Sequence, residues 1–230
     1  MEAIILAGGK GTRLKSVVAD VPKPMAPIAG RPFLCYLLDN LSDANFDRVI
    51  LSVGYKREVI QKYFGSLYGK MRLEYYAEET PLGTGGAIKA ALGRCNDDIV
   101  FVLNGDTLFQ VDYAAMRRLH VAGQAPLTMA VKELTDFDRY GSLAIEDGRI
   151  TEFREKAFTE RGFINGGIYL MARDLLHDAP EGNFSLEQDF LMRRAVPMNA
   201  FLSEGYFLDI GIPEDYRRAQ RELPTLRRGG

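Results

Sequence analysis

The sequence predicts an α/β fold: a Rossmann-like, mixed and mostly parallel sheet flanked by helices. Two observations support this prediction. Short apolar runs typical of buried strands alternate with segments whose apolar residues recur every three or four positions, as in amphipathic helices. The chain has 230 residues, of which 47% are hydrophobic, so it can bury one large core. Since no repeat or low-complexity linker divides it, we expect a single domain over 1–230.

The first half of the chain carries the regular alternation. Its apolar runs predict strands at Glu2–Ala7, Arg48–Val53, Leu73–Ala77 and Ile99–Leu103. The segments between them predict helices at Phe33–Leu41, Glu58–Phe64 and Ala87–Leu92. Alternating strands and helices pair in parallel, and such sheets bind ligands at the carboxyl ends of their strands.

The second half, from about residue 125, has shorter connections and a more mixed pattern. It predicts strands at Leu127–Val131, Gly141–Ile145, Ile150–Glu155 and Phe163–Met171. These are followed by a helix over Leu186–Arg193, a short strand near Phe201 and a last helix from Pro213. We expect this half to form a second lobe of the same domain and to cover the same crevice.

Composition and charge narrow the class of protein. Lys and Arg number 29 against 31 Asp and Glu, a net charge of −2, which indicates no nucleic-acid partner. Cys35 and Cys95 are far apart and are expected to be reduced core residues. No leader sequence or membrane-spanning run is evident, so the expected compartment is the cytoplasm, with no membrane partner.

A glycine-rich loop follows the first strand, with the sequence Gly8-Gly9-Lys10-Gly11-Thr12-Arg13-Leu14. Its glycines let backbone N–H groups approach a ligand, and Lys23 follows between two prolines. Gly-Gly alone also occurs at ordinary strand-to-helix turns. The spacing is neither that of the P-loop nor Gly-x-Gly-x-x-Gly, which disfavours an ATPase or a dehydrogenase. The loop and its cations predict a polyphosphate site.

Two acidic turns predict a metal site. Asp106 follows a buried strand and Gly105, and Asp209 is flanked by apolar residues. Either one alone could be an Asx turn or a helix cap. An unpaired charge among apolar residues is costly, and two carboxylates converging on Mg²⁺ and phosphate oxygens would avoid that cost. No His, Cys or Ser nucleophile motif is present, and His120 and His177 receive no role.

The stretch from Gly8 through Pro22-Lys23-Pro24-Met25 resembles the opening of the sugar-1-phosphate nucleotidyltransferases, and the resemblance extends to about Tyr216. It implies transfer of a nucleoside monophosphate from a nucleoside triphosphate to a sugar 1-phosphate. Arg13 and Lys23 would be the catalytic residues, and Asp106 and Asp209 the Mg²⁺ ligands. Residues about 1–110 would bind the nucleotide and about 111–222 the sugar phosphate. The implied nucleotide contacts are Leu6, Ala7, Gly8, Gly9, Lys10, Gly11, Thr12, Glu78, Pro81, Gly83, Thr84, Asn104 and Gly105.

The same resemblance implies a sugar-phosphate site made by Lys156, Asn165, Gly166 and Glu187. Each of these residues also has an ordinary interpretation. Lys156 ends a predicted strand, where a solvated charge is common, and Asn165-Gly166-Gly167 could be a glycine bulge. Glu187 begins a predicted helix, where acidic residues are favoured in any case.

Glu78 is the candidate selector of the base. It lies just before Pro81-Leu82-Gly83-Thr84, where thymidylyl- and uridylyltransferases of the family usually carry glutamine. Guanine presents two adjacent N–H donors that one carboxylate can accept together, whereas uracil and thymine suit an amide. The resemblance and this chemistry favour GTP over UTP or dTTP. The alternative is a surface glutamate in the acidic pair Glu78-Glu79.

The sugar substrate is the least constrained part of the prediction. The resemblance is to short guanylyltransferases without a C-terminal β-helix domain, and it implies heptose 1-phosphate as substrate. The product would be GDP-heptose for bacterial capsule or surface polysaccharide. Mannose 1-phosphate, or uridylyl transfer, is the alternative within the family, and a homodimer is left open. A non-catalytic GDP-sugar-binding regulatory subunit is a second alternative, against which the retained charged residues argue: Arg13, Lys23, Asp106, Lys156 and Asp209.

Overall fold

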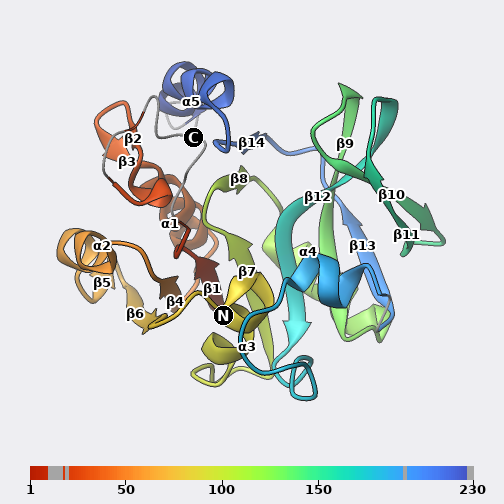
Figure 1. The fold of residues 1–230 in the computed structure, drawn as a ribbon, viewed down its shortest axis with the longest axis horizontal. Coiled ribbons are helices and arrows are strands. Elements are labelled where there is room, and N and C mark those ends of the chain that lie inside the picture. Colours follow the sequence, from red (N-terminus) through yellow and green to blue (C-terminus); the bar gives the residue numbers. More distant parts are fainter. Residues whose placement is uncertain (10–17, 19–20, 194–195, 227–230) are drawn as a thin grey trace.

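The computed structural model describes residues 1–9, 18, 21–193 and 196–226. A ten-stranded sheet runs through these residues, with helices packed on it (Figure 1). Its strand order is β10-β11-β13-β9-β12-β7-β1-β4-β6-β5. The parallel part consists of β1 (Glu2–Leu6), β4 (Arg48–Val53), β6 (Met71–Ala77) and β7 (Ile99–Asn104). These four strands confirm the predicted strands of the first half.

Three helices connect the parallel strands: α1 (Phe33–Asp43), α2 (Arg57–Phe64) and α3 (Gly83–Leu92). From β1 the chain passes through α1 to β4 and then through α2 to β6, both on one side of β1. It then returns through α3 to β7, on the other side of β1. The strand order therefore reverses between β1 and β7, whose last residues Leu6 and Asn104 are paired in register. In open α/β sheets a crevice for ligands forms at such a reversal.

The second half is built mainly from antiparallel pairs, among β9 (Leu127–Phe137), β10 (Gly141–Glu146), β11 (Arg149–Lys156) and β12 (Thr159–Ala172). Within the described residues of this half, the one parallel pair is that of β13 (Met198–Leu202) with β9. The mixed α/β sheet is thus confirmed, but the expectation of a mostly parallel sheet holds only for the first half. The reason is short hairpin connections: Asp147 and Gly148, with φ of 49° and 73°, turn β10 directly into β11.

Several elements were not predicted from the pattern. They are α4 (Tyr113–Gly123), the short strands β2 (Pro27–Ile28), β3 (Arg31–Pro32), β5 (Leu67–Tyr68), β8 (Thr107–Phe109) and β14 (Phe207–Asp209), and a 3₁₀ turn over Lys23–Met25. The helix expected over Leu186–Arg193 is a single π-helical turn, Leu186–Leu191, whereas α5 (Pro213–Leu226) begins where predicted. The start of α4 had a usable signal, since the Asp112 side chain accepts a hydrogen bond from the Ala115 N–H at 2.8 Å.

The core consists of two clusters of buried residues, one on each face of the sheet. Successive residues of a strand point to opposite faces, so Ile5 packs with α1 and α2 while Ile4 packs with α3. Both clusters include residues from each half of the chain. Cys35 and Cys95 are buried free thiols, and burial raises the pKa of Cys95 to about 12. Among the described helices, none has the length and apolar character needed to cross a membrane.

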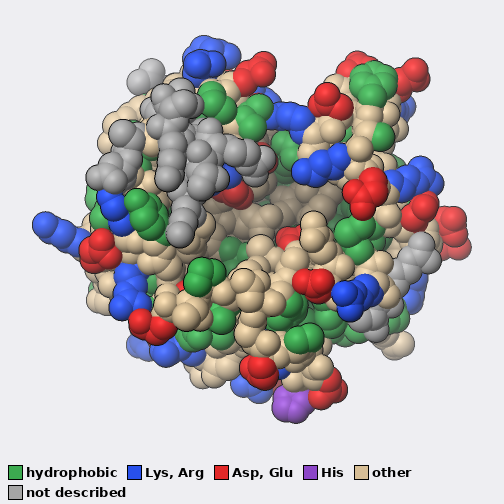
Figure 2. Space-filling model, in the orientation of Figure 1, with side chains coloured by type: hydrophobic (Ala, Val, Ile, Leu, Met, Phe, Trp, Pro, Cys, Tyr) green, Lys and Arg blue, Asp and Glu red, His purple; other side chains and the backbone are tan. Residues whose placement is uncertain are grey.

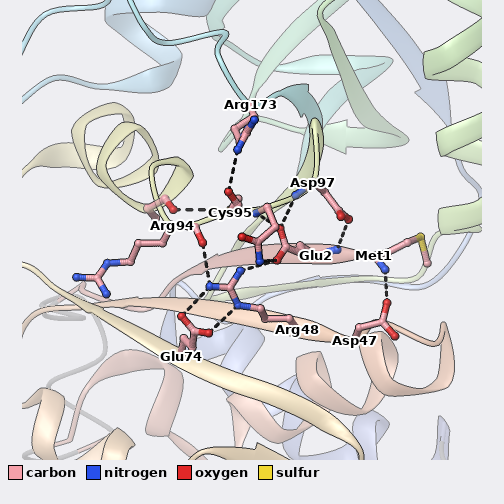
Figure 3. Close-up of polar contacts among 11 residues, drawn as sticks. Met1, Glu2, Asp47, Arg48, Glu74, Arg94, Cys95, Asp97 and Arg173 are labelled. Atoms are coloured by element: carbon pink, nitrogen blue, oxygen red, sulfur yellow. Dashed lines mark hydrogen bonds and ion pairs between the residues drawn. The ribbon is translucent and has the colours of Figure 1, made fainter.

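A partly buried ionic cluster joins the first residues of β1 and β4 to Glu74 of β6 (Figure 3). The Arg48 guanidinium donates to both carboxylate oxygens of Glu74 at 2.7 Å and to Glu2 Oε1 at 2.5 Å. The other oxygen of Glu2 accepts hydrogen bonds from the backbone N–H groups of Asn96 and Asp97. The cluster therefore ties the loop before β7 to the central strands, at the end of the sheet opposite the Leu6–Asn104 pair.

Glu2→Gln should lower the free energy of unfolding at pH 7 by about 2 kcal/mol, because it leaves Arg48, whose side chain is only 13% exposed, without one charged partner. Burial alone would raise the pKa of Glu2, but hydrogen bonds from Asp97 and Arg48 outweigh burial and hold the pKa below 4.5. The stabilisation is therefore fully present above pH 4.5 and is lost as the pH falls through the lowered pKa. Urea unfolding at pH 7 and at about pH 3.5 should show the wild-type advantage shrinking at the lower pH. Glu181→Gln, at an exposed glutamate, is the control, and an equal loss at both pH values would contradict the assignment.

Candidate functional site

Two cavities open at the carboxyl ends of the parallel strands, in the hollow of the face drawn in Figure 2. The first cavity, of about 670 Å³, extends from the loop after β1 to the start of α3. The second, of about 860 Å³, is lined largely by the antiparallel half of the sheet. Asn104 and Asp106, at the end of β7, line both cavities. Two ligands could therefore meet above the same strand end.

Glycines allow the backbones to approach closely at the first cavity. The Gly105 N–H donates to Leu6 O at 3.1 Å, and a Cβ on Gly105 would lie 2.3 Å from that oxygen. Four of the residues predicted to contact a nucleotide line the cavity: Leu6, Gly8, Gly9 and Gly105. Ala7 is fully buried beside them and does not line it. The first strand and the end of β7 thus form one wall of this cavity.

Glu78 follows β6 and faces the glycine loop. Its Oε1 accepts from the Ser52 hydroxyl at 3.0 Å, and its Oε2 accepts from the Leu82 N–H at 3.4 Å. A Cβ on Gly8 would lie 2.6 Å from Glu78 Oε1, so glycine at position 8 makes room for this carboxylate. The side chain is partly buried and lines the first cavity. The carboxylate is therefore held in place, whereas its neighbour Glu79 is 81% exposed and pairs with Arg57.

The start of α3 lies on the opposite wall of the first cavity. Three further residues predicted to contact a nucleotide line it: Pro81, Gly83 and Thr84. Gly83 has φ of +68°, and a Cβ there would lie 2.4 Å from Phe184 O, so only glycine suits this turn. Thr84 does not only face the cavity: its hydroxyl donates to Glu187 Oε2 at 2.7 Å. The first cavity is thereby joined to a residue of the second.

Lys23 lies between the two predicted metal ligands. Its ammonium group pairs with Asp106 and lies 3.9 Å from Asp209 Oδ1, and its side chain is only 10% exposed. The pairing of β14 with β8 brings Asp209 next to Asp106, since the Ile210 N–H donates to Asp106 O at 3.0 Å. Burial, and then the charge of Asp106, raise the pKa of Asp209, while Lys23 lowers it. Two crowded carboxylates around one cation are suited to bind a divalent metal ion.

Three of the predicted sugar-phosphate residues line the second cavity: Lys156, Asn165 and Glu187. Lys156 is exposed at the end of β11. Gly166 is buried instead in the bulge of β12, and a Cβ there would lie 2.4 Å from Phe109 Cδ1. The structure gives Gly166 a packing role against Phe109, and it is absent from the cavity lining.

Some residues of the second cavity were not predicted as site residues. Arg139 and Tyr140 follow β9, and Glu155 precedes Lys156. Arg139 donates to Asp215 Oδ2 at 2.7 Å and so stands close to the Asp209 turn. Burial raises the pKa of Tyr140 to about 12, so this phenol stays protonated at neutral pH. Charged and aromatic residues in a connection carry no periodic signal by which sequence reasoning could have found them.

The predicted Lys10, Gly11, Thr12 and Arg13 lie outside the described residues. Gly9, the last described residue before them, lines the first cavity. Their contacts with the nucleotide remain predictions. Among the described residues, no group of three or more His, Cys, Asp or Glu side chains gathers as a metal cluster. Any metal ion here would therefore depend on the aspartate pair and on ligand oxygens.

The chain is similar to known proteins over nearly its whole length. The family model for nucleotidyl transferases matches residues 2–225. The chain is 47% identical to D-glycero-alpha-D-manno-heptose 1-phosphate guanylyltransferase of Aneurinibacillus thermoaerophilus, over 97% of this chain and 98% of the relative. It is 43% identical to the Campylobacter jejuni protein of the same name, over 94% and 97% of the two chains. The crystal structure of HddC from Yersinia pseudotuberculosis complexed with GMP-PN superposes with a TM-score of 0.87, at 39% identity over 96% of this chain and 99% of that chain.

Proposed function

The chain belongs to the nucleotidyl transferase family, and on that premise we propose that it transfers GMP from GTP to D-glycero-α-D-manno-heptose 1-phosphate. The products are GDP-heptose and pyrophosphate. The observation that carries the proposal is the pair of cavities that share Asn104 and Asp106. A nucleotide in the first cavity and a sugar 1-phosphate in the second would bring their phosphates together at these two residues, beside Lys23.

In this mechanism an oxygen of the sugar 1-phosphate attacks the α-phosphorus of GTP in line, and pyrophosphate leaves. A phosphate oxygen is already ionised at neutral pH, so the reaction needs no general base. The protein's work is positioning and charge compensation. Lys23 would hold the α-phosphate region and the attacking phosphate, and Lys156 the sugar phosphate. Arg13 and Lys10 would stabilise the triphosphate and the charge that develops on pyrophosphate.

Asp106 and Asp209 are the residues we propose for Mg²⁺. The fit rests on their chemistry: two carboxylates, both partly buried, already surround the Lys23 ammonium group. Carboxylate and phosphate oxygens are ligands that Mg²⁺ prefers. When bound, the ion supplies positive charge beside the phosphates of both substrates. Asp106 and Asp209 would hold the ion, and Lys23 beside them would add a second positive charge.

Base selection rests on Glu78. Its two oxygens are fixed by Ser52 and by the Leu82 N–H, and each keeps a lone pair for a ligand. Guanine N1–H and the exocyclic NH₂ can donate to the two oxygens together, with the charge strengthening both bonds. Asn165 and Glu187 are proposed to bind sugar hydroxyls in the second cavity. The cytoplasm is the proposed compartment, and the buried reduced thiols suit it.

Pyrophosphate release from GTP, measured across a panel of sugar 1-phosphates with Mg²⁺, tests the proposal. Heptose 1-phosphate should give the highest kcat/KM, and replacing GTP with UTP should lower it strongly. Highest turnover with mannose 1-phosphate would replace the sugar while keeping the reaction. Binding of a GDP-sugar without release of pyrophosphate from any pair would overturn the enzymatic function and favour a regulatory subunit.

A further inference from the structure

Tyr169 contacts two residues that line the second cavity, although it lines neither cavity itself. It belongs to β12, which lies between β7 and β9 in the sheet (Figure 1), and its side chain is 0% exposed. Its hydroxyl accepts from Asn165 Nδ2 at 2.7 Å and donates to Glu187 Oε1 at 3.3 Å. Burying a hydroxyl without hydrogen-bond partners is costly, so these two partners stabilise the buried phenol.

The groups around Asn165, Tyr169 and Glu187 determine which atom donates in each of these hydrogen bonds. The Gly167 N–H donates to Asn165 Oδ1 at 2.9 Å, which turns the Asn165 NH₂ group toward Tyr169. Since the phenol accepts from Asn165, its single proton is left to donate to Glu187. Burial, and then the charge of Glu187, raise the pKa of Tyr169, so the phenol keeps that proton.

The series of hydrogen bonds that starts at Asn165 ends at Thr84, which lines the first cavity. Glu187 Oε2 accepts from the Thr84 hydroxyl at 2.7 Å and from the Ser185 hydroxyl at 3.1 Å. Thr84 in turn accepts from the Leu186 N–H at 2.9 Å, so its own proton must point to Glu187. The carboxylate of Glu187 is therefore fixed from both sides, by Thr84 on α3 and by Tyr169 on β12.

Asn165 and Glu187 both line the second cavity, and each has one hydrogen-bonding group that the contacts above do not use. Asn165 keeps one N–H donor, and Glu187 Oε1 keeps a lone pair as an acceptor. A donor and an acceptor held by one tyrosine match two neighbouring hydroxyls of a sugar ring, one accepting and one donating. We infer that Tyr169, assisted by Thr84, is a positioning residue that orients Asn165 and Glu187 to bind a vicinal diol of the sugar. The inference rests on the proposed function, since it deepens the sugar half of that site.

Tyr169→Phe removes only the hydroxyl and keeps the buried ring. The KM for the sugar 1-phosphate should rise on the order of tenfold, because a hydrogen bond to each of two sugar-binding groups is lost. The KM for GTP and kcat should change less than twofold. Tyr113→Phe is the matched control: that tyrosine is also fully buried, but its hydroxyl has no partner among the described residues, so its removal should leave both KM values unchanged.

A second pair of variants, at Thr84, tests the hydrogen bond to the other oxygen of Glu187. It also serves if Tyr169→Phe does not fold. Thr84→Val removes the donor to Glu187 and should raise the KM for the sugar 1-phosphate, whereas Thr84→Ser retains the hydroxyl and should restore it. An unchanged sugar KM in Tyr169→Phe, or an equal rise in the KM for GTP, would overturn the positioning role. Where the first variant is unstable, an unchanged sugar KM in Thr84→Val would overturn the positioning role; a change in its KM for GTP does not bear on that role, because Thr84 also lines the first cavity.

Binding of the sugar 1-phosphate, measured by calorimetry, separates this inference from the proposed function. If the wild-type chain binds heptose 1-phosphate but releases no pyrophosphate, the proposed function fails. The positioning role is then judged on the dissociation constants, which should differ about tenfold between wild type and Tyr169→Phe. A wild-type chain that binds no sugar 1-phosphate overturns the inference.

Discussion

Asp106→Asn should lower kcat for pyrophosphate release by roughly a thousandfold, while the protein stays folded. The substitution keeps the shape of the side chain and removes the charge that pairs with Lys23 and lies beside Asp209. If Asp106 holds Mg²⁺ between the two substrates, the amide binds the ion weakly and leaves the phosphates without a positive partner. The measurement is turnover at saturating GTP and sugar 1-phosphate, with Mg²⁺ titrated over a wide range.

The control for this prediction is Asp147→Asn, the same exchange in the exposed turn between β10 and β11. It should leave kcat and the thermal unfolding midpoint unchanged. Thermal unfolding of Asp106→Asn distinguishes a catalytic loss from a structural one, since a merely structural ion pair with Lys23 would lower stability and leave turnover of the folded fraction intact. Turnover within threefold of wild type would remove Asp106 from the proposed mechanism.

The parts of the fold predicted from sequence were those in which burial leaves a regular pattern. β1, β4 and β7 are covered by helices, so their apolar runs are nearly continuous and their ends are well marked, whereas β6 is interrupted by Arg72 and Glu74. The antiparallel pairing of the second half depends on tight turns such as Asp147-Gly148, and the apolar pattern does not report the direction of a strand. β8 and β14 are too short to show any period.

The candidate site divides in a similar way. Asp106 and Asp209 could be chosen because each is an acidic residue next to a buried segment, and the β8–β14 pairing brings them together. Arg139 and Tyr169 could not be chosen. The first lies in a connection, and the second is a buried aromatic residue in a strand, where packing alone would account for it. Its hydrogen bonds to Asn165 and Glu187 exist only once β12 meets the π-helical turn.

Glu78→Gln should reduce the preference for GTP over UTP by roughly a hundredfold. The surroundings determine how the new amide lies: its oxygen must face the Leu82 N–H, which can only donate, and its NH₂ faces the Ser52 hydroxyl, which can accept. The NH₂ group then meets one of the two guanine donors, so one charge-assisted bond is lost and two donors oppose each other. Uracil, with one N–H between carbonyls, gains the donor and acceptor that it needs.

The kcat/KM values for GTP and UTP with one sugar 1-phosphate give the measurement, and Glu79→Gln is its control. Glu79 is the adjacent glutamate but is 81% exposed and paired with Arg57, so its loss should leave the ratio unchanged. An unchanged ratio in Glu78→Gln would assign Glu78 to the surface acidic pair and leave selection of the base to the backbone of the glycine loop. A reduced ratio in both variants would show that the preference for GTP depends on the negative charge of the Glu78-Glu79 pair. Only a change confined to position 78 is explained by hydrogen bonding to the base, because only that carboxylate is held between Ser52, Leu82 and Gly8.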